Sequence, residues 1–124
     1  MADRELTFVE ALNEGLRGEL RRNSSVIVMG ESISGGMHGV TKDLVQEFGA
    51  ERVRDTPISE SSFIGAGVGA AMLGFRPVVE LMYVDFFGVA MDQIYNQAAK
   101  TRYMLGGKVK VPLTLRAAFG AGLH

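Results

Sequence analysis

The chain has 124 residues, of which 47% are hydrophobic, and its 13 basic and 14 acidic residues leave a formal net charge of −1. This length is typical of one domain with its own core, and the absence of cysteine excludes a disulfide framework, a thiolate nucleophile and a cysteine zinc site. No basic tract indicates binding to nucleic acid or to an anionic membrane, and the chain has no signal-like N-terminus or long apolar run, so we expect a soluble, cytoplasmic protein.

The first predicted elements are a helix and a buried strand. Thr7 and Glu10 form a capping box, in which each side chain bonds the backbone amide of the other residue. The helix that follows is expected to end at residues 23–25 (NSS). Residues 26–30 (VIVMG) are an uninterrupted apolar run that ends in glycine, which is typical of a strand buried on both faces.

A glycine-rich loop, residues 34–39, follows this strand. It contains His38, which we expect to face solvent. Thr41 is then expected to begin a short amphipathic helix, which Gly49 ends. Residues 52–55 (RVRD) form the next short strand of the pattern.

An extended turn, residues 56–58 (TPI), leads into the next helix, because proline restricts the residue before it to extended conformations. Ser59 is placed to cap that helix, which runs through small and apolar residues up to Gly74. Residues 77–82 (PVVELM) then form a strand with Pro77 in its first position, where no ladder donor is needed.

A long helix is predicted from about residue 87 to residue 105, and residues 111–116 (VPLTLR) form the last strand. Strands separated by helices indicate an α/β fold with a mostly parallel sheet and right-handed connections. The chain stops at residues 119–124, in a loop directly after a strand, where parallel sheets build their ligand sites. We therefore expect residues 1–124 to be one domain, truncated relative to a longer protein.

The densest chemical signal is residues 55–60 (DTPISE), in which Glu60 falls in the first turn of a helix behind a rigid proline turn. Helix-end amides favour its ionised form, whereas apolar neighbours such as Ile58 and Phe63 favour the neutral acid. A carboxyl group held between these limits suits proton exchange near neutral pH. From composition alone, however, a surface carboxylate that complements the helix dipole is the commoner explanation.

The glycines of this helix, Gly65, Gly67 and Gly69, are similar to a dinucleotide-binding fingerprint. They begin five residues into the helix, however, and not in the strand-to-helix turn. Glu80 also comes too early, inside a strand, for the usual ribose contact. The pattern therefore does not favour an NAD site, and we expect these glycines to let another helix approach closely across a subunit boundary.

Phe86 lies with Tyr83 and Phe87 where a strand meets the next helix. Ordinary core packing explains such a cluster most simply. The functional alternative is an aromatic wall for a flat heterocycle, since aromatic rings stack and contact one another in specific geometries.

Taken together, these motifs resemble the β subunits of thiamine-dependent 2-oxoacid dehydrogenases, the group that includes pyruvate, branched-chain 2-oxoacid and acetoin dehydrogenases. The motifs, which extend over nearly the whole chain, are residues 55–60 (DTPISE), Gly65 and Gly69, residues 76–78 (RPV), residues 92–94 (DQI) with Asn96, residues 98–100 (AAK) and residues 106–107 (GG). The resemblance implies a pyrimidine-binding domain of the transketolase-like type, with three layers in the order α/β/α.

The resemblance also implies a cofactor and its contacts. Glu60 would hydrogen-bond a ring nitrogen of thiamine diphosphate and activate the cofactor for oxidative decarboxylation and acyl transfer to lipoamide. Phe86 and Met82 match positions that line the pyrimidine pocket, and we expect Ile58 beside them. No residue of this chain is expected to bind a metal, because in this group the partner chain holds the diphosphate through Mg²⁺.

The partners implied are an α subunit with the diphosphate-binding domain, a second β subunit and the lipoyl acyltransferase component. Chains of this group are roughly twice as long as this one or longer. Their catalytic histidine lies in a His-Ser-Gln motif, which Leu123 and His124 do not supply. No Gly-Asp-Gly signature for Mg²⁺ and diphosphate occurs in the sequence. We therefore expect this chain alone to be inactive.

Two alternatives remain open from the sequence. The first is a non-catalytic module of the same fold, which mediates oligomer contacts through its glycine-rich helix. The second is another transketolase-like enzyme, such as a sugar-transferring one. Residues 92–94 and 98–100 favour the oxoacid group over the second alternative.

Overall fold

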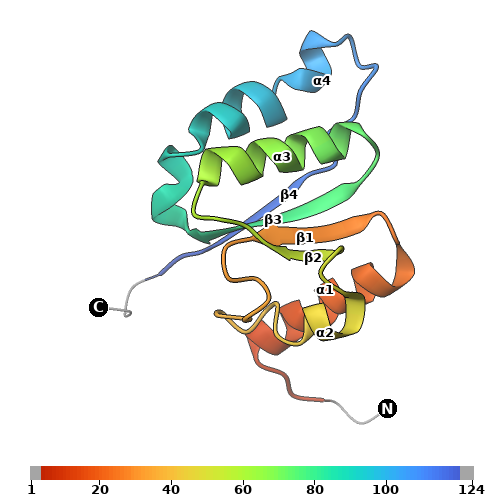
Figure 1. The fold of residues 1–124 in the computed structure, drawn as a ribbon, viewed down its shortest axis with the longest axis vertical. Helices are drawn as coiled ribbons and strands as arrows, with labels where there is room; N and C mark the ends of the chain where they lie inside the picture. Colours follow the sequence, from red (N-terminus) through yellow and green to blue (C-terminus); the bar gives the residue numbers. More distant parts are fainter. Residues whose placement is uncertain (1–3, 121–124) are drawn as a thin grey trace.

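The computed structural model describes residues 4–120, and within them it has a four-stranded parallel sheet with the strand order β2-β1-β3-β4 (Figure 1). The strands are β1 (Val26–Gly30), β2 (Val53–Asp55), β3 (Arg76–Tyr83) and β4 (Thr114–Ala118). The α-helices are α1 (Phe8–Arg22), α2 (Leu44–Phe48), α3 (Glu60–Met72) and α4 (Thr101–Met104). A 3₁₀-helix, η1 (Val84–Gly88), and a π-helix, η2 (Asp92–Ala98), lie between β3 and α4.

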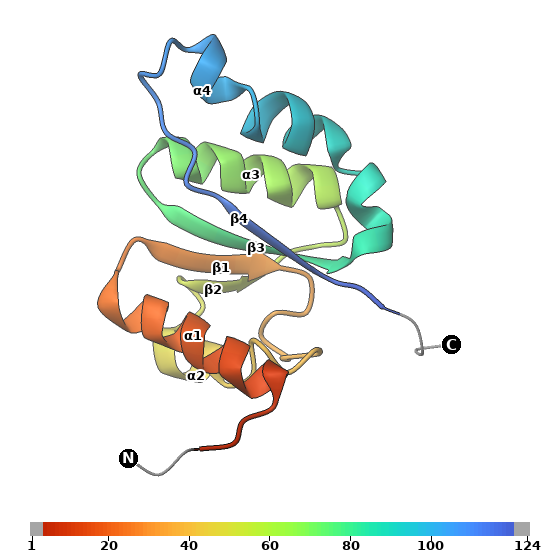
Figure 2. The same cartoon turned by 180° about the vertical axis from the view of Figure 1, so that it is seen from behind.

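The helices form two layers, one on each face of the sheet. Helices α1 and α2 cover one face, and α3 with the η1–α4 segment covers the other (Figures 1 and 2). The predicted three-layer α/β/α fold with a parallel sheet is therefore confirmed. No helix in residues 4–120 is both long enough and apolar enough to cross a membrane.

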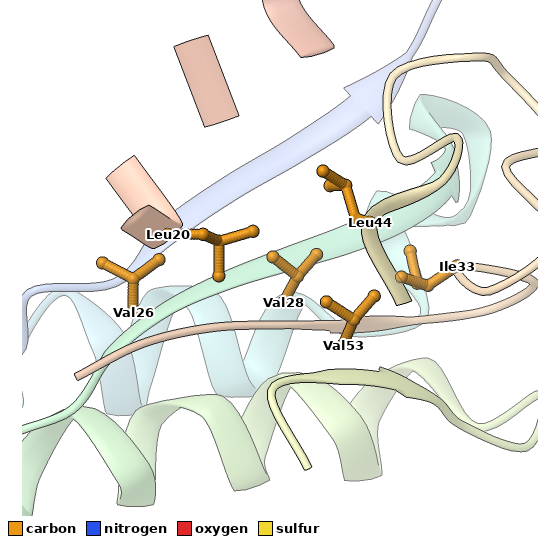
Figure 3. Packing of buried hydrophobic residues seen from close by; sticks show 6 residues of the cluster. All are labelled: Leu20, Val26, Val28, Ile33, Leu44 and Val53. Carbon is orange, nitrogen blue, oxygen red and sulfur yellow. The ribbon is translucent and has the colours of Figure 1, made fainter. Parts of the chain in front are cut away.

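Two buried apolar clusters join the layers to the sheet. On the α1–α2 side, the cluster in Figure 3 consists of Leu20, Val26, Val28, Ile33, Leu44 and Val53. On the α3 side, the cluster consists of Phe63, Ile64, Val79, Leu81 and Ala90. The side chains of a strand alternate between the faces of its sheet. Met29 of β1 therefore packs against the second cluster and Val78 of β3 against the first.

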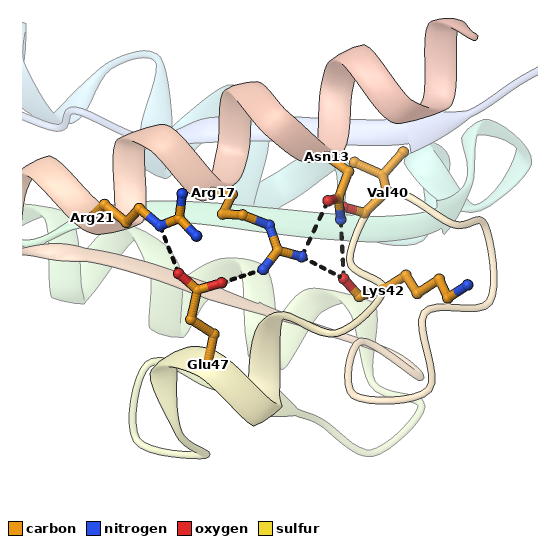
Figure 4. A network of polar contacts seen from close by, with 6 residues as sticks. All are labelled: Asn13, Arg17, Arg21, Val40, Lys42 and Glu47. Atoms are coloured by element: carbon orange, nitrogen blue, oxygen red, sulfur yellow. Dashed lines mark hydrogen bonds and ion pairs between the residues drawn. The ribbon is translucent and has the colours of Figure 1, made fainter. Parts of the chain in front are cut away.

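The capping box predicted for α1 is present. The Thr7 amide donates to Oε2 of Glu10 at 2.8 Å, and the Glu10 amide donates to Oγ1 of Thr7 at 3.2 Å. A polar network between the two helices joins α1 to α2 (Figure 4). In it, the Glu47 carboxylate accepts hydrogen bonds from Arg17 and Arg21.

Helix α2 begins later than predicted, at Leu44 instead of Thr41. Asp43, just before it, has a φ of 61°, in the left-handed region. An α-helix cannot pass through a left-handed residue, so residues 41–43 form turns. The predicted end at Gly49 is confirmed, since the Gly49 amide closes the last turn on the carbonyl of Val45 at 2.9 Å.

The glycines of α3 serve contacts within the chain. A Cβ at Gly67 would lie 2.6 Å from Cγ2 of Val79, and a Cβ at Gly65 would lie 2.8 Å from Oε1 of Gln93. These two glycines let α3 pack closely on β3 and on η2. The expected close approach of another helix is therefore present at Gly65, but from η2 of the same chain, and Gly67 admits a strand instead. The approach across a subunit boundary stays a prediction, and Gly69 has open space beside it.

The single helix predicted from residue 87 to residue 105 is also wrong. The segment is interrupted, first by the end of η1 at Gly88 and then by the wider turns of η2. In η2, the Ala99 amide donates to the carbonyl of Ile94 at 3.0 Å, which is the i→i+5 bond of a π-helix. Such π-turns are frequent at functional sites, and this one contains most of the 92–100 motif region.

Candidate active site

The candidate site lies at the carboxyl edge of the sheet, where the C-terminal ends of the parallel strands meet. The chain passes from β1 to its neighbour β2 on one side and then to β3 on the other side of β1. Loops leave in opposite directions at such a switch point, and open α/β sheets bind their ligands in the resulting crevice. The loop after β1, the start of α3 and the η1 segment after β3 all begin at this edge.

Glu60 is the first residue of α3 and is buried, with 8% of its surface exposed. The first turn of α3, which contains Glu60, is closed by the backbone, since the amides of Ser62 and Phe63 donate to the carbonyl of Ser59 at 2.8 and 3.1 Å. Ser59 is the N-cap residue by position, as predicted. The expected side-chain cap is wrong, however, because the Ser59 hydroxyl donates to the carbonyl of Pro57.

A second acid, Glu31, lies near Glu60 and was not identified from the sequence. It directly follows β1, has 7% of its surface exposed, and its Oε1 is buried without a hydrogen-bond partner among the described residues. Burial raises the pKa of Glu31, and the charge of Glu60 raises it further. The available signal was an acidic residue directly after a strand buried on both faces, at the edge where ligand sites form.

The three apolar residues predicted to line the site have side chains that are at least partly accessible. Ile58, two residues before Glu60, is 83% exposed, and Phe86 in η1 is 39% exposed, while Met82 near the end of β3 is half-buried. The Ser61 hydroxyl donates to the carbonyl of Val89 at 2.8 Å, which ties the first turn of α3 to the chain just after η1. The fold therefore brings the Glu60 and Phe86 segments to one edge.

The loop after β1 is anchored to β2. The Ser34 amide donates to Oδ1 of Asp55 at 2.8 Å, and the Ser34 hydroxyl bonds the other carboxylate oxygen. These bonds from Ser34 lower the pKa of Asp55. Asp55, the first residue of the 55–60 motif, therefore positions the loop that carries Glu31.

His38, in the same loop, is half-buried and so only partly faces solvent, where full exposure was predicted. Its Nε2 is buried without a hydrogen-bond partner in the described part of the chain. Its ring contacts Tyr83 edge to face at 5.4 Å between centroids, and Tyr83 contacts Phe86 in the same way at 6.2 Å. His124, the other histidine, lies outside the described residues, as does Leu123.

Several polar atoms in the loops that follow β1 and β2 are buried without a hydrogen-bond partner among the described residues. Three buried polar atoms have no partner within residues 4–120, namely Oε1 of Glu31, Nε2 of His38 and Oγ1 of Thr56, and all three follow β1 or β2. Buried polar atoms in proteins are normally hydrogen-bonded, so these atoms favour a bound group or solvent at the edge. Within residues 4–120, no cluster of His, Cys, Asp and Glu suited to a metal ion is present.

Residues 4–124 match the family model described as transketolase, pyrimidine binding domain. Similar proteins include the acetoin:2,6-dichlorophenolindophenol oxidoreductase subunit beta of Bacillus subtilis, which is 45% identical over 135 residues. The pyruvate dehydrogenase E1 component subunit beta of Rhizobium meliloti is 51% identical over 118 residues, and the 2-oxoisovalerate dehydrogenase subunit beta of B. subtilis is 40% identical over 121 residues.

These alignments include 98%, 94% and 96% of this chain, respectively. They include only 40%, 26% and 37% of the three relatives. The chain thus spans two fifths or less of the length of these relatives.

Proposed function

Because the chain belongs to the transketolase pyrimidine-binding domain family, we propose that it forms the half of a thiamine diphosphate site that holds the aminopyrimidine ring. The similarity to acetoin and pyruvate dehydrogenase β subunits supports a second part of the proposal. This domain would belong to the β subunit of a 2-oxoacid or acetoin dehydrogenase. The observation that carries the proposal is the buried carboxyl group of Glu60 at the carboxyl edge of the sheet.

Glu60 would hydrogen-bond a ring nitrogen and exchange a proton with it. No side chain in residues 4–120 donates a hydrogen bond to its carboxyl group within 3.5 Å, so the group is available to a ligand. The raised pKa of Glu31 means that this neighbouring carboxyl holds its proton to a higher pH than an ordinary glutamate does.

Ile58, Met82 and Phe86 would supply the apolar contacts that orient a flat ring over Glu60. Such sites combine apolar walls with a few polar groups that fix the orientation of the ligand. The high exposure of Ile58 in the isolated chain supports this role, because its apolar surface is available to a ligand or to a partner chain.

When bound, thiamine diphosphate supplies the electron sink for cleavage next to a 2-oxo carbon. This chain supplies the proton donor and acceptor at the pyrimidine end. The diphosphate and its Mg²⁺ would be held by an α subunit, as we expect from the family. We also propose that the chain associates with a second β subunit and that a lipoyl acyltransferase accepts the acyl group. The location that we propose for the assembly is the cytoplasm.

Replacing Glu60 by Gln tests the assigned role. In the complete subunit assembled with its α partner, Glu60→Gln should slow oxidative decarboxylation by about 10²- to 10⁴-fold, as expected for loss of one acid–base group. Glu51→Gln is the matched control, because Glu51 is an exposed glutamate in the turn before β2. A Glu60→Gln rate within a few-fold of the control would refute the proposal.

A further inference from the structure

Ser34 and Asp55 join the loop after β1 (residues 31–43) to the end of β2 by two hydrogen bonds. The Ser34 amide donates to Oδ1 of Asp55 at 2.8 Å, and the Ser34 hydroxyl bonds Oδ2. An aspartate is ionised at neutral pH, and hydrogen bonds to an ionised acceptor are stronger than neutral ones. We call these two residues the Ser34–Asp55 clamp. It lies at the carboxyl edge of the sheet, because Asp55 is the last residue of β2.

The clamp is also joined to the segment that leads to Glu60. Asp55 pairs with Gly30 of β1 in the register of the sheet, and the Thr56 amide donates to the carbonyl of Gly30 at 2.9 Å. Residues 56–59 then lead directly to Glu60, the first residue of α3. The same aspartate therefore holds the loop and begins the segment that ends in Glu60.

The loop is folded on itself in successive turns. The Gly36 amide donates to the carbonyl of Ile33 at 3.2 Å, and the Gly39 amide donates to the carbonyl of Gly36 at 2.7 Å. An added Cβ at Gly36 would lie 2.8 Å from Cα of Lys42, so the loop also packs closely against its own return to α2. Close packing transmits displacements, so a restraint at Ser34 also limits movement at the far end of the loop.

That far end contacts the aromatic residues of the proposed pyrimidine pocket. His38 lies edge to face against Tyr83, with 5.4 Å between the ring centroids, and Tyr83 lies edge to face against Phe86 at 6.2 Å. Tyr83 ends β3, and Phe86 follows in η1. The loop therefore extends from its bonds with β2 to the aromatic wall formed by Tyr83 and Phe86.

From these contacts, we propose that Ser34 and Asp55 are positioning residues for the pyrimidine site, and that their clamp holds the loop against the aromatic wall before the cofactor binds. The inference rests on the proposed function, because it requires Phe86 to contact the bound ring. Both residues act through the loop and not by touching the cofactor. Loss of the clamp lowers the fraction of molecules with the loop in place, so the apparent dissociation constant rises in proportion.

Three variants separate the clamp from a general effect on folding. Ser34→Ala removes the hydroxyl bond and keeps the amide bond, whereas Asp55→Ala removes both. Asp55→Asn keeps an oxygen for the Ser34 amide, and its NH₂ group can donate to the Ser34 hydroxyl, so it should restore the clamp without the charge. Ser34 is half-buried and Asp55 is exposed, so these changes leave no cavity in the core. Glu51→Ala, at an exposed position before β2, is the control.

Calorimetry measures the binding of thiamine diphosphate with Mg²⁺ to the assembled enzyme for each variant. We expect the dissociation constant to rise about tenfold for Asp55→Ala and about threefold for Ser34→Ala, and to change by less than about twofold for Asp55→Asn and Glu51→Ala. Amide hydrogen exchange of the assembled enzyme without cofactor gives a second measurement. Residues 32–39 should exchange faster in Asp55→Ala, whereas the amides of β1 should not change.

Unchanged binding in both Ser34→Ala and Asp55→Ala would overturn the inference. Equal weakening in Asp55→Asn and Asp55→Ala would also overturn it, because the charge and not the clamp would then be the cause. Circular dichroism identifies a variant that fails to fold, and the comparison then uses the remaining two. Glu60→Gln separates the two proposals: a normal rate for Glu60→Gln refutes the proposed function, whereas a defect there with unchanged binding in the clamp variants refutes only the role of the clamp.

Discussion

Glu31 and Glu60, the residue after β1 and the first residue of α3, are both buried and interact electrostatically at the carboxyl edge of the sheet. A negative charge on Glu60 disfavours a second negative charge on Glu31, because like charges repel in a buried position. The pKa of Glu31 is raised, first by its burial and second by the charge of Glu60. The two residues are therefore coupled, and ionisation of Glu31 is disfavoured by its burial and by its neighbour.

The raised pKa of Glu31 predicts a pH-dependent cost to stability. The folded chain binds this proton more tightly than the unfolded chain, so ionisation of Glu31 destabilises the fold. The cost is absent below the pKa of the unfolded chain and grows as the pH rises through the folded pKa. Glu31→Gln should therefore raise the free energy of unfolding at pH 7 and leave it unchanged at about pH 3, below the ordinary range of glutamate. Urea unfolding at both pH values measures this, and a variant that is less stable at pH 7 would contradict it.

The buried ion pair of Glu80 and Arg116 predicts a larger change in the free energy of unfolding. Arg116→Met leaves the carboxyl group of Glu80 buried without its cation, and removing one partner of a buried pair costs about 3 kcal/mol or more. The loss should shrink as the pH falls and Glu80 takes up a proton. The matched control is the double variant Glu80→Leu with Arg116→Met, which removes both charges and should regain most of the stability. Equal losses in the single and double variants would show that the charge is not the cause.

Hydrogen bonds at the junction of α1 and α2 predict a loss of folding stability that does not depend on ion pairs. The Asn13 amide donates to the carbonyls of Val40 at 2.7 Å and Lys42 at 3.1 Å, in the loop before α2 (Figure 4). Asn13→Leu keeps the approximate size of the side chain without adding a charge beside Arg17 but removes both donors, which should cost about 1–2 kcal/mol. Thermal or urea unfolding checks this. Glu14→Gln, on the neighbouring exposed position of α1, is a control in which little change is expected.

Elements with local signals could be predicted from the sequence. The capping box of α1 depends on two residues three positions apart, and the apolar run of β1 identifies a strand buried on both faces. The break in the 84–105 segment could not be predicted in the same way. Its apolar spacing suits one helix, whereas the π-turns of η2 occur where the Gln93 side chain packs against Gly65 of another helix.

The candidate site was predicted only in part for a similar reason. The 55–60 motif placed Glu60 at the start of a helix, and the structure confirms that position. The burial of Glu31 and of Nε2 of His38 depends on which elements pack against the loop after β1. Glycine-rich loops are usually on the surface, so His38 was assigned to solvent. The roles of Glu60, Ile58, Met82 and Phe86 in binding a cofactor stay predictions for the experiments above.

The close packing of α3 on the sheet predicts opposite effects for two glycines of the same helix. Gly67 faces the buried side chain of Val79, and an added Cβ at 2.6 Å from it would force the helix or the strand to shift. Such overpacking costs about 1–3 kcal/mol, which exceeds the gain of about 1 kcal/mol from a better helix former.

Gly69 is the internal control for this prediction, because no heavy atom lies within 4 Å of its added Cβ. Gly69→Ala should therefore stabilise the chain by about 0.5–1 kcal/mol, whereas Gly67→Ala should destabilise it. Urea unfolding of the two variants gives the sign directly. If both substitutions stabilise the chain, α3 can move away from β3 at little cost, and the rigid placement of Glu60 at the start of α3 would lose its structural basis.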